Sequence, residues 1–246
     1  MVGLAARLKN VEEFATQALN MPASISVIIP ALNEEKSIAP VLADLVSLQP
    51  HEVIVVDGGS TDRTREISAQ LGAVVITGAP GRARQMNCGA GQATGDILLF
   101  LHADTRLPSG AFDAIVSALQ DPHYLGGRFD VDLDGDHWLL KVIGAMINQR
   151  SRITKVGTGD QAIFVWREVF ACMGGFPDIP LMEDIAFCRE LKRLGGIACL
   201  RSRVLTSARR WEKGVWRTVM KMWILKLLYF AGVSPVTLKR FYADTR

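Results

Sequence analysis

Side chains suited to chemistry stand at the end of the most hydrophobic predicted strand. The stretch 97–101 reads ILLFL, and His102 and Asp104 follow it almost at once. A short apolar run bounded by polar residues is typical of a buried strand. A carboxylate at the mouth of such a strand is a natural oxygen ligand for Mg²⁺ or Mn²⁺, which in turn binds the phosphates of a nucleotide. The simpler interpretation is a turn aspartate, because Asp-Thr-Arg-Leu-Pro is favourable turn chemistry.

A second acidic feature is the pair Glu183 and Asp184 in the stretch MEDIAF, at the start of a helix predicted over 182–196. A positioned carboxylate can take a proton from an attacking hydroxyl as a general base. Acidic residues in a first helical turn are also favoured by the helix dipole in any protein, so the pair has a purely structural interpretation as well.

The elements that must position these side chains alternate regularly in the first half of the chain. Apolar strands predicted at 24–30, 52–59, 73–78 and 96–104 are separated by helices at 37–48, 60–72 and 82–93. This pattern predicts a mainly parallel sheet with helices on both faces. Ligands of such sheets bind outside the carboxyl ends of the strands. Polar residues follow three of these ends: Asn33 and Glu34, then Asp57, then His102 and Asp104.

The second half is less regular. We expect a half-exposed strand at 125–133, a helix at 137–153, a strand running into a helix at 159–170, and a strand at 197–207. No repeat or linker is visible. The expected organisation is an N-terminal arm at 1–23, one α/β domain at 24–210, and an amphipathic helical tail at 211–246.

Composition narrows the class of protein. The chain has 246 residues, of which 49% are hydrophobic, so it can bury a sizeable core. Its net charge of +3 is too small to indicate nucleic-acid binding. The four cysteines form no CxxC pair or zinc pattern, so we expect reduced, mostly buried thiols in a cytoplasmic protein. We expect no signal peptide and no membrane-spanning helix.

Four stretches occur in a recognisable order: VIIPALNEEKSI, VIVVDGGSTDRT, GRARQMNCGAGQATGD and LLFLHADT. With them the chain resembles the family 2 glycosyltransferases, the inverting enzymes with the GT-A fold, over roughly residues 24–210. The GT-A fold is a Rossmann-like, mainly parallel mixed sheet. FLHADT resembles a bacterial subgroup in which His-Ala-Asp replaces the usual DxD metal motif, with one carboxylate fewer for a metal ion.

The resemblance implies a nucleotide-sugar donor, with uridine favoured, and Mg²⁺ or Mn²⁺ bound by Asp104. His102 would contact the ribose or the sugar, or bind the metal weakly. Asp57 would accept a hydrogen bond from the base. Basic residues would bind the diphosphate, although Arg82 and Arg84 could equally form a solvated basic face. The implied donor-binding residues are Pro30, Ala31, Glu34, Asp57, Arg82, Arg84, His102, Asp104 and Arg210.

The resemblance also implies catalytic and acceptor-binding roles. Asp184 would be the general base, with Glu183 as its neighbour or substitute. Asp160 and Gln161, in the glycine-containing stretch 156–165, would bind the donor sugar or the acceptor, with a simple turn into a strand as the structural alternative. The Arg209-Arg210-Trp211 stretch resembles the Arg-Arg-Trp-like element that closes family 2 sites, so Trp211 would lie near the acceptor.

The tail combines apolar and basic residues at helical spacing. Between 215 and 230 it carries Trp, Leu, Met and Phe, interrupted by Arg217, Lys221 and Lys226. A basic helix of this kind suits a membrane interface, although core packing or a dimer face would give the same pattern. We therefore expect peripheral contact through residues 211–232, at the inner face of the cytoplasmic membrane. A lipid-linked or cell-envelope acceptor with an unsubstituted hydroxyl follows from that expectation.

Three alternatives to transfer of a sugar fit the sequence less well. A nucleotidyltransferase needs a glycine-rich basic loop after the first strand, where PALNEEKS has acids. A NAD-dependent dehydrogenase needs a GxGxxG stretch there, which is missing. A non-catalytic nucleotide-sugar sensor or membrane scaffold would bind nucleotide without turnover, but the retained Asp104 and Glu183–Asp184 pair argue against it.

Overall fold

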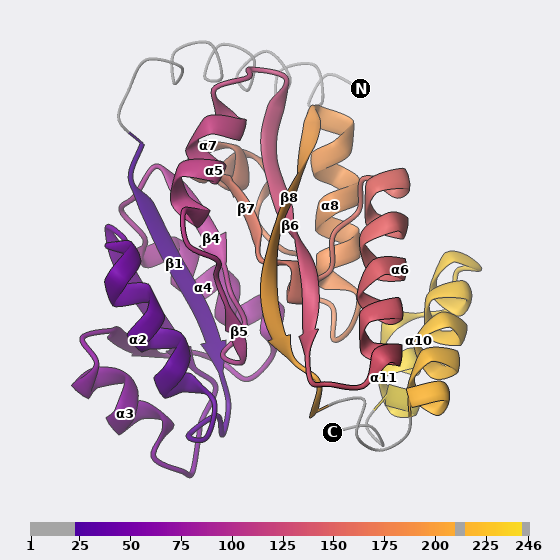
Figure 1. Ribbon diagram of the computed structural model, residues 1–246, viewed down its shortest axis with the longest axis horizontal. Helices are drawn as coiled ribbons and strands as arrows, with labels where there is room; N and C mark the ends of the chain where they lie inside the picture. Colours follow the sequence, from indigo (N-terminus) through magenta and orange to yellow (C-terminus); the bar gives the residue numbers. More distant parts are fainter. Residues whose placement is uncertain (1–22, 210–214, 243–246) are drawn as a thin grey trace.

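The computed structural model describes residues 23–209 and 215–242. Its centre is one eight-stranded sheet with the order β3-β2-β1-β4-β7-β6-β8-β5 (Figure 1). The strands are β1 (Ile25–Ala31), β2 (Glu52–Asp57), β3 (Val74–Thr77), β4 (Ile97–Phe100), β5 (Thr105–Arg106), β6 (Tyr124–Asp134), β7 (Ile163–Trp166) and β8 (Gly196–Ser207).

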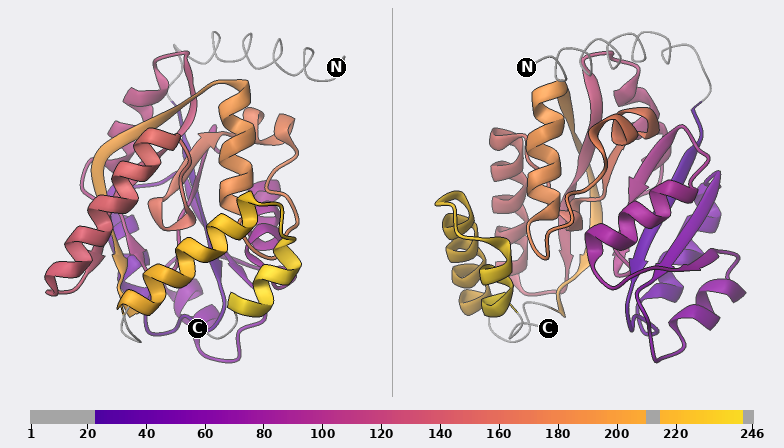
Figure 2. Two further views of the ribbon diagram at one scale, coloured as in Figure 1. Left: turned by 90° about the vertical axis from the view of Figure 1, so that its right-hand side faces the viewer. Right: turned by 180° about the vertical axis from the view of Figure 1, so that it is seen from behind.

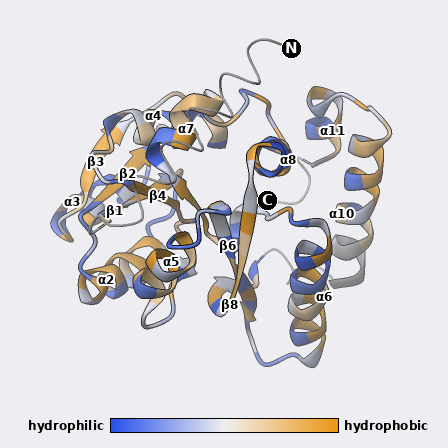
Figure 3. Ribbon diagram, turned by 90° about the horizontal axis from the view of Figure 1, so that it is seen from above, coloured by the Kyte–Doolittle hydropathy of each residue, from blue (hydrophilic) through white to orange (hydrophobic). Residues whose placement is uncertain are grey.

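The first half forms the expected parallel sheet. Strand β1 pairs in parallel with β2 and with β4, and β2 pairs in parallel with β3. The apolar runs of β1 and β4 are buried because helices cover both faces: α2 and α5 lie on one face, and α4 and α7 on the other (Figure 3). The helices of the described chain up to β7 are α2 (Ile38–Leu48), α3 (Thr64–Gln70), α4 (Arg82–Gln92), α5 (Ala111–Leu119), α6 (Trp138–Thr154) and the 3-10 turn η1 (Gly159–Gln161).

The second half adds antiparallel pairs to the sheet. Strand β7 runs antiparallel to both β4 and β6, β6 runs parallel to β8, and β5 pairs antiparallel with β8. The sheet is therefore mixed and mainly parallel, which confirms the predicted fold class. Two further helices, α7 (Arg167–Met173) and α8 (Glu183–Leu194), complete the domain.

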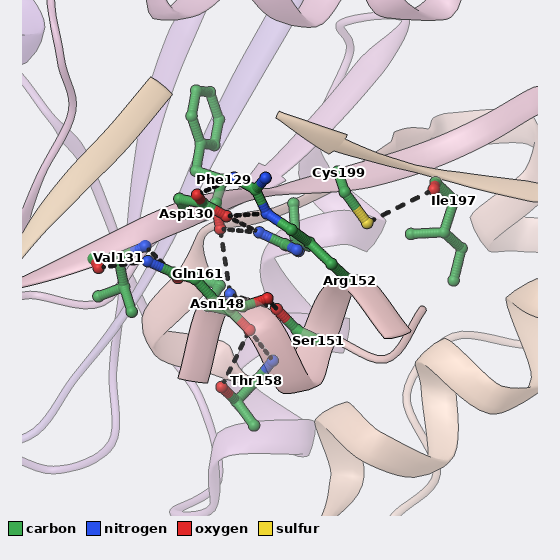
Figure 4. A network of polar contacts seen from close by, with 11 residues as sticks. Phe129, Asp130, Val131, Asn148, Ser151, Arg152, Thr158, Gln161, Ile197 and Cys199 are labelled. Carbon is green, nitrogen blue, oxygen red and sulfur yellow. Dashed lines mark hydrogen bonds and ion pairs between the residues drawn. The ribbon is translucent and has the colours of Figure 1, made fainter. Parts of the chain in front are cut away.

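Strand β6 differs from its sequence-based prediction. We expected a half-exposed strand, but nearly all of it is buried, including Arg128 and Asp130. Burial is possible because the charges are paired: the Asp130 carboxylate binds both Arg128 and Arg152 (Figure 4). The amide of Asn148 also donates to and accepts from the Val131 backbone, at 3.0 and 2.8 Å, which ties α6 to this strand.

The C-terminal segment forms two helices, α10 (Val215–Phe230) and α11 (Pro235–Tyr242), that lie beside α6 and α8 (Figure 2). Leu225 and Leu238 belong to the main buried core, so these helices are packed onto the domain. None of the described helices is both long and apolar enough to cross a membrane. The four cysteines are unbonded, but only Cys188 is fully buried, where burial raises the pKa of its thiol to about 12.

Candidate functional site

A guanidinium joins two carboxylates at the carboxyl end of the sheet. Glu34 follows β1 and Asp104 follows β4, and these strands are neighbours. The Nη2 atom of Arg209 donates to Glu34 Oε2 and to Asp104 Oδ2, at 2.9 Å each. Burial alone would lower the pKa of Arg209, but the bonds to Asp104 and Glu34 outweigh it and raise that pKa above its ordinary value. The two predicted donor-site carboxylates therefore lie together.

Asp57 supports the turn that follows β2. Its side chain is 1% exposed, and its oxygens accept the backbone N–H groups of Gly59 and Ser60 at 3.1–3.2 Å. The amide of Gln85, from α4, donates to the carbonyls of Ala31 and Val56 at 2.8 Å and so holds the ends of β1 and β2 together. Asp57 and Ala31 are register partners in these strands, which places the predicted nucleotide-binding residues Pro30, Ala31 and Asp57 at one edge.

Asp184, His102 and Gly159 meet on the other side of the β4 end. Asp184 accepts the backbone N–H of Gly159 at 2.8 Å and that of Ile185 at 2.7 Å. A Cβ atom placed on Gly159 would lie 2.5 Å from His102 Nε2, so the imidazole packs directly on that glycine. His102 and Asp104 are two residues apart, and hence the carboxylate pair and the Asp184 cluster adjoin the same short segment after β4. Each Asp184 oxygen keeps an unused lone pair for a further proton or donor.

The prediction for Gln161 needs correction. We expected this residue to bind the donor sugar or the acceptor, but its side chain is fully buried. Its amide donates to Phe129 O at 3.2 Å and to Ser151 Oγ at 3.0 Å, and its oxygen accepts from Thr158 N at 3.2 Å (Figure 4). Gln161 therefore holds the turn η1 against β6 and α6, which positions Gly159 beneath Asp184.

A cavity of about 300 Å³ opens beside the Asp184 cluster, between α6, α8 and α10. Its polar end includes His102, Gly159 and Asp160, together with Glu183 and Asp184. Predicted donor-site residue Arg82 also lines it. The rest of the wall is mainly apolar, with Ile143, Met146, Ile147, Val156, Leu181, Met182, Ile185, Met222, Trp223, Leu227 and Phe230. Arg150, Thr154, Thr158 and Lys226 are its other polar or basic lining residues.

Arg150 is a lining residue that the sequence did not reveal. Burial lowers its pKa and the charge of Arg128 adds to that, whereas the charges of Asp160 and Asp184 oppose it. Its Nε and Nη2 atoms are buried without a hydrogen-bond partner among the described residues. A basic residue near the end of a helix is expected from the helix dipole alone, so nothing in the sequence marked it out.

The other predicted basic and polar residues take different positions. Arg84 lies at the surface, where its Nε atom pairs with Asp178 at 2.8 Å. Asn87 exchanges hydrogen bonds with the Phe176 backbone at 2.8 and 2.9 Å, the structural role expected for it. Arg210 and Trp211 lie outside the described residues.

The donor set at Asp104 fits a divalent cation that is only partly bound by protein. Among the described residues, no three His, Cys, Asp or Glu side chains form a complete metal site. However, Asp104 and Glu34 already share one cation, the guanidinium of Arg209. Mg²⁺ commonly uses one or two carboxylates and takes its other ligands from water and substrate phosphates. Two neighbouring carboxylates at the sheet edge match that requirement.

Curated relatives carry transferase names. A 4,4'-diaponeurosporenoate glycosyltransferase of Staphylococcus haemolyticus is 37% identical over 113 residues, which cover 42% of this chain and 30% of the relative. An undecaprenyl-phosphate 4-deoxy-4-formamido-L-arabinose transferase of Yersinia enterocolitica is 28% identical over 181 residues, covering 68% of this chain and 52% of the relative. The chain thus spans about half the length, or less, of these relatives.

Solved structures share the fold. A glucosyl-3-phosphoglycerate synthase of Mycobacterium tuberculosis, in complex with Mn²⁺, UDP and glucosyl-3-phosphoglycerate, has a TM-score of 0.62 at 21% identity, covering 90% of this chain and 83% of the other. A mannosyltransferase of Pyrobaculum calidifontis with GDP-Man and Mn²⁺ has a TM-score of 0.61 at 20% identity, covering 94% and 74%. These similarities establish a GT-A-like fold. The sequence model described as Glycosyl transferase family 2 matches residues 26–174, more than half of the chain, and the protein therefore belongs to that family.

Proposed function

We propose that the protein is an inverting glycosyltransferase that moves a sugar from a UDP-sugar to an acceptor hydroxyl. The proposal rests on one observation: two sets of polar side chains lie close to the end of β4. On one side lie the neighbouring carboxylates Asp104 and Glu34, and on the other lies Asp184 against Gly159 and His102. This arrangement supports a metal-diphosphate site beside a general base.

The reaction would be a single displacement at the anomeric carbon. The acceptor oxygen forms a bond to that carbon while the bond from the carbon to the diphosphate oxygen breaks. The hydroxyl proton passes to Asp184, whose orientation is held by two backbone N–H groups. UDP leaves with the electron pair of the broken bond. No covalent enzyme intermediate is needed, so the configuration at the anomeric carbon inverts.

Asp104, with Glu34 beside it, would hold Mg²⁺ or Mn²⁺, which supplies Lewis-acid stabilisation of the diphosphate. Arg209, which bonds one oxygen of each carboxylate, would add positive charge beside this site and could donate to diphosphate oxygens. Arg82, at the start of α4, supplies a further cation near the β4 end. The Asp57 turn and the ends of β1 and β2 would form the nucleotide pocket.

The names of the curated relatives favour a membrane lipid or a lipid-linked glycan as acceptor. We also propose that the protein contacts the inner face of the cytoplasmic membrane through the segment 211–232. Support comes from α10, where Trp223 and Leu227 are 49% and 64% exposed beside Lys221 and Lys226. Exposed apolar side chains next to basic ones suit an anionic lipid surface.

The proposal is tested by Asp184→Asn. Donor binding, measured by calorimetry with UDP and Mn²⁺, should be unchanged, whereas sugar transfer to any acceptor that the native protein uses should fall at least about 100-fold, the scale of general-base catalysis. Transfer at the native rate by this variant would remove Asp184 from the mechanism. Binding of UDP without any transfer or hydrolysis by the native protein would instead favour a non-catalytic sensor.

A further inference from the structure

The cavity between α6, α8 and α10 connects the Asp184 cluster to the surface. Its inner end is formed by His102, Gly159 and Asp184, the groups at which the acceptor oxygen must arrive. Any acceptor that brings its hydroxyl to Asp184 from this side must lie in the cavity or pass through it. The shape and chemistry of the cavity walls therefore describe the acceptor.

The walls are mainly apolar, and their apolar part continues onto the outside of the molecule. Met146 on α6 and Trp223, Leu227 and Phe230 on α10 line the cavity. The same side chains are 48%, 49%, 64% and 59% exposed. The two helices lie side by side at one edge of the domain (Figure 2). An apolar chain can therefore enter between them along these side chains, beside the polar Thr154 and the basic Lys226 that also line the cavity.

A sugar or a polypeptide would fit these walls poorly. A glycan hydroxyl placed against Ile143, Ile147 or Met222 would lose its hydrogen bonds to water and gain none, at a cost for each group. A hydrocarbon chain has no such groups and gains from every CH₂ that it buries. The volume of about 300 Å³ is at the lower end of small-molecule sites, which suits the head-proximal part of a longer chain.

We propose that this cavity binds the apolar chain of an amphiphilic acceptor, with the oxygen-bearing head group beside Asp184 and Arg150. This inference rests on the proposed function and assigns the part of the same site that binds the chain of such an acceptor. A hydroxyl head attacks the anomeric carbon as described above, its proton going to Asp184 and UDP leaving. An ionised phosphate oxygen would form the same bond, with UDP leaving and no proton to transfer. The rest of the chain lies along the exposed faces of α6 and α10.

Arg150 identifies the polar end of this site. Two of its nitrogen atoms lack hydrogen-bond partners among the described residues. The negative charges of Asp160 and Asp184 act on its guanidinium and favour its charged form. A head group with either a hydroxyl or a phosphate oxygen can accept from a guanidinium, but a phosphate gains more from it. Arg150→Gln thus distinguishes a phosphate head from an uncharged one.

The test measures binding of alkyl phosphates and the matching n-alcohols, from four to ten carbons, by calorimetry in the presence of UDP and Mn²⁺. Affinity should rise about fourfold for each CH₂ that enters the cavity and then level off. Ile147→Trp, which fills the cavity from α6, should abolish that rise, and so should Met222→Trp from α10. Ile153→Trp is the matched control, because Ile153 is 72% exposed on the same helix and does not line the cavity.

The inference would be overturned if the affinity of the native protein did not change with chain length. It would also be overturned if Ile147→Trp and Ile153→Trp reduced the affinity for the longer chains equally. If Arg150→Gln weakens only the phosphates, the head group is anionic; if it affects neither series, the head is uncharged and the chain site stands. Binding of UDP distinguishes failure of the proposed function from failure of the amphiphile site alone. Without UDP binding the proposed function fails, whereas UDP binding with a flat series removes only the amphiphile site.

Discussion

Gly159 offers a direct way to disturb the catalytic cluster without touching a charged group. An added Cβ atom would lie 2.5 Å from His102 Nε2 and 2.9 Å from Cε1, where ordinary contacts are 3.4–4 Å. Either the ring or the turn must therefore move by about 1 Å. The same residue donates its N–H to Asp184 at 2.8 Å, so the shift is passed to the proposed base. Displacement of about 1 Å can cost roughly 100-fold in rate.

We accordingly expect Gly159→Ala to lower kcat about 100-fold while the Kd for UDP with Mn²⁺ changes little, because Asp104 and Glu34 are untouched. Overpacking should cost about 1–3 kcal/mol of stability, so a thermal melt must confirm folding at the assay temperature. Gly91→Ala is the control, since an added Cβ on this helical residue meets nothing within 4 Å and should stabilise by roughly 0.5–1 kcal/mol. Native turnover by folded Gly159→Ala would refute the reasoning.

Three further perturbations test other parts of the structure. Asp130→Asn leaves two arginines without their shared counter-ion. It should lower the free energy of unfolding, measured by urea denaturation, by about 3–5 kcal/mol. The control Asp132→Asn breaks an exposed pair and should lower that free energy by less than about 1 kcal/mol. Arg209→Met removes the guanidinium that competes with a metal ion for Asp104. Mn²⁺ should therefore bind the nucleotide-free variant about tenfold more tightly than the native protein, as measured by titration calorimetry. Equal Mn²⁺ affinity in the two proteins would contradict a metal site at Asp104. Trp223→Asp should weaken co-sedimentation with anionic vesicles, and Val46→Asp, at an exposed apolar position on α2, should not.

The parallel half of the fold was predictable because its signals are local. Strands β1, β2 and β4 are apolar runs buried on both faces, and such runs are recognisable without knowledge of their partners. Their order in the sheet places Glu34, Asp57 and Asp104 at one edge, as parallel strands require. Their position at the same end of the sheet thus followed from strand direction alone.

The misreading of β6 has a clear physical origin. Arg128 and Asp130 give an alternating pattern that predicts a solvent-facing side, and only the approach of Arg152 from α6 makes their burial possible. That contact joins residues far apart in the chain, so no local pattern reports it. The structural role of Gln161 was hidden for the same reason, because its partners come from β6 and α6.

The cavity could not have been predicted either. Its lining comes from α6, α8 and α10. The apolar residues of an amphipathic helix indicate a buried face, but not which other helices surround it. The tail was interpreted as a membrane-facing helix, and the structure shows that α10 also forms one wall of the proposed acceptor site. Arg150 is the clearest case, because its position near the Asp184 cluster depends on the tertiary packing that brings α6 and α8 to one cavity.

Titration of UDP into the native protein, with and without Mn²⁺, tests the central claim most directly, since that claim is a cation held by Asp104 against the nucleotide diphosphate. The account predicts binding that is strongly enhanced by Mn²⁺, loss of that enhancement in Asp104→Asn, and native behaviour in Asp136→Asn, at an exposed loop position. UDP binding that is the same with and without Mn²⁺, or unaffected by Asp104→Asn, would contradict it.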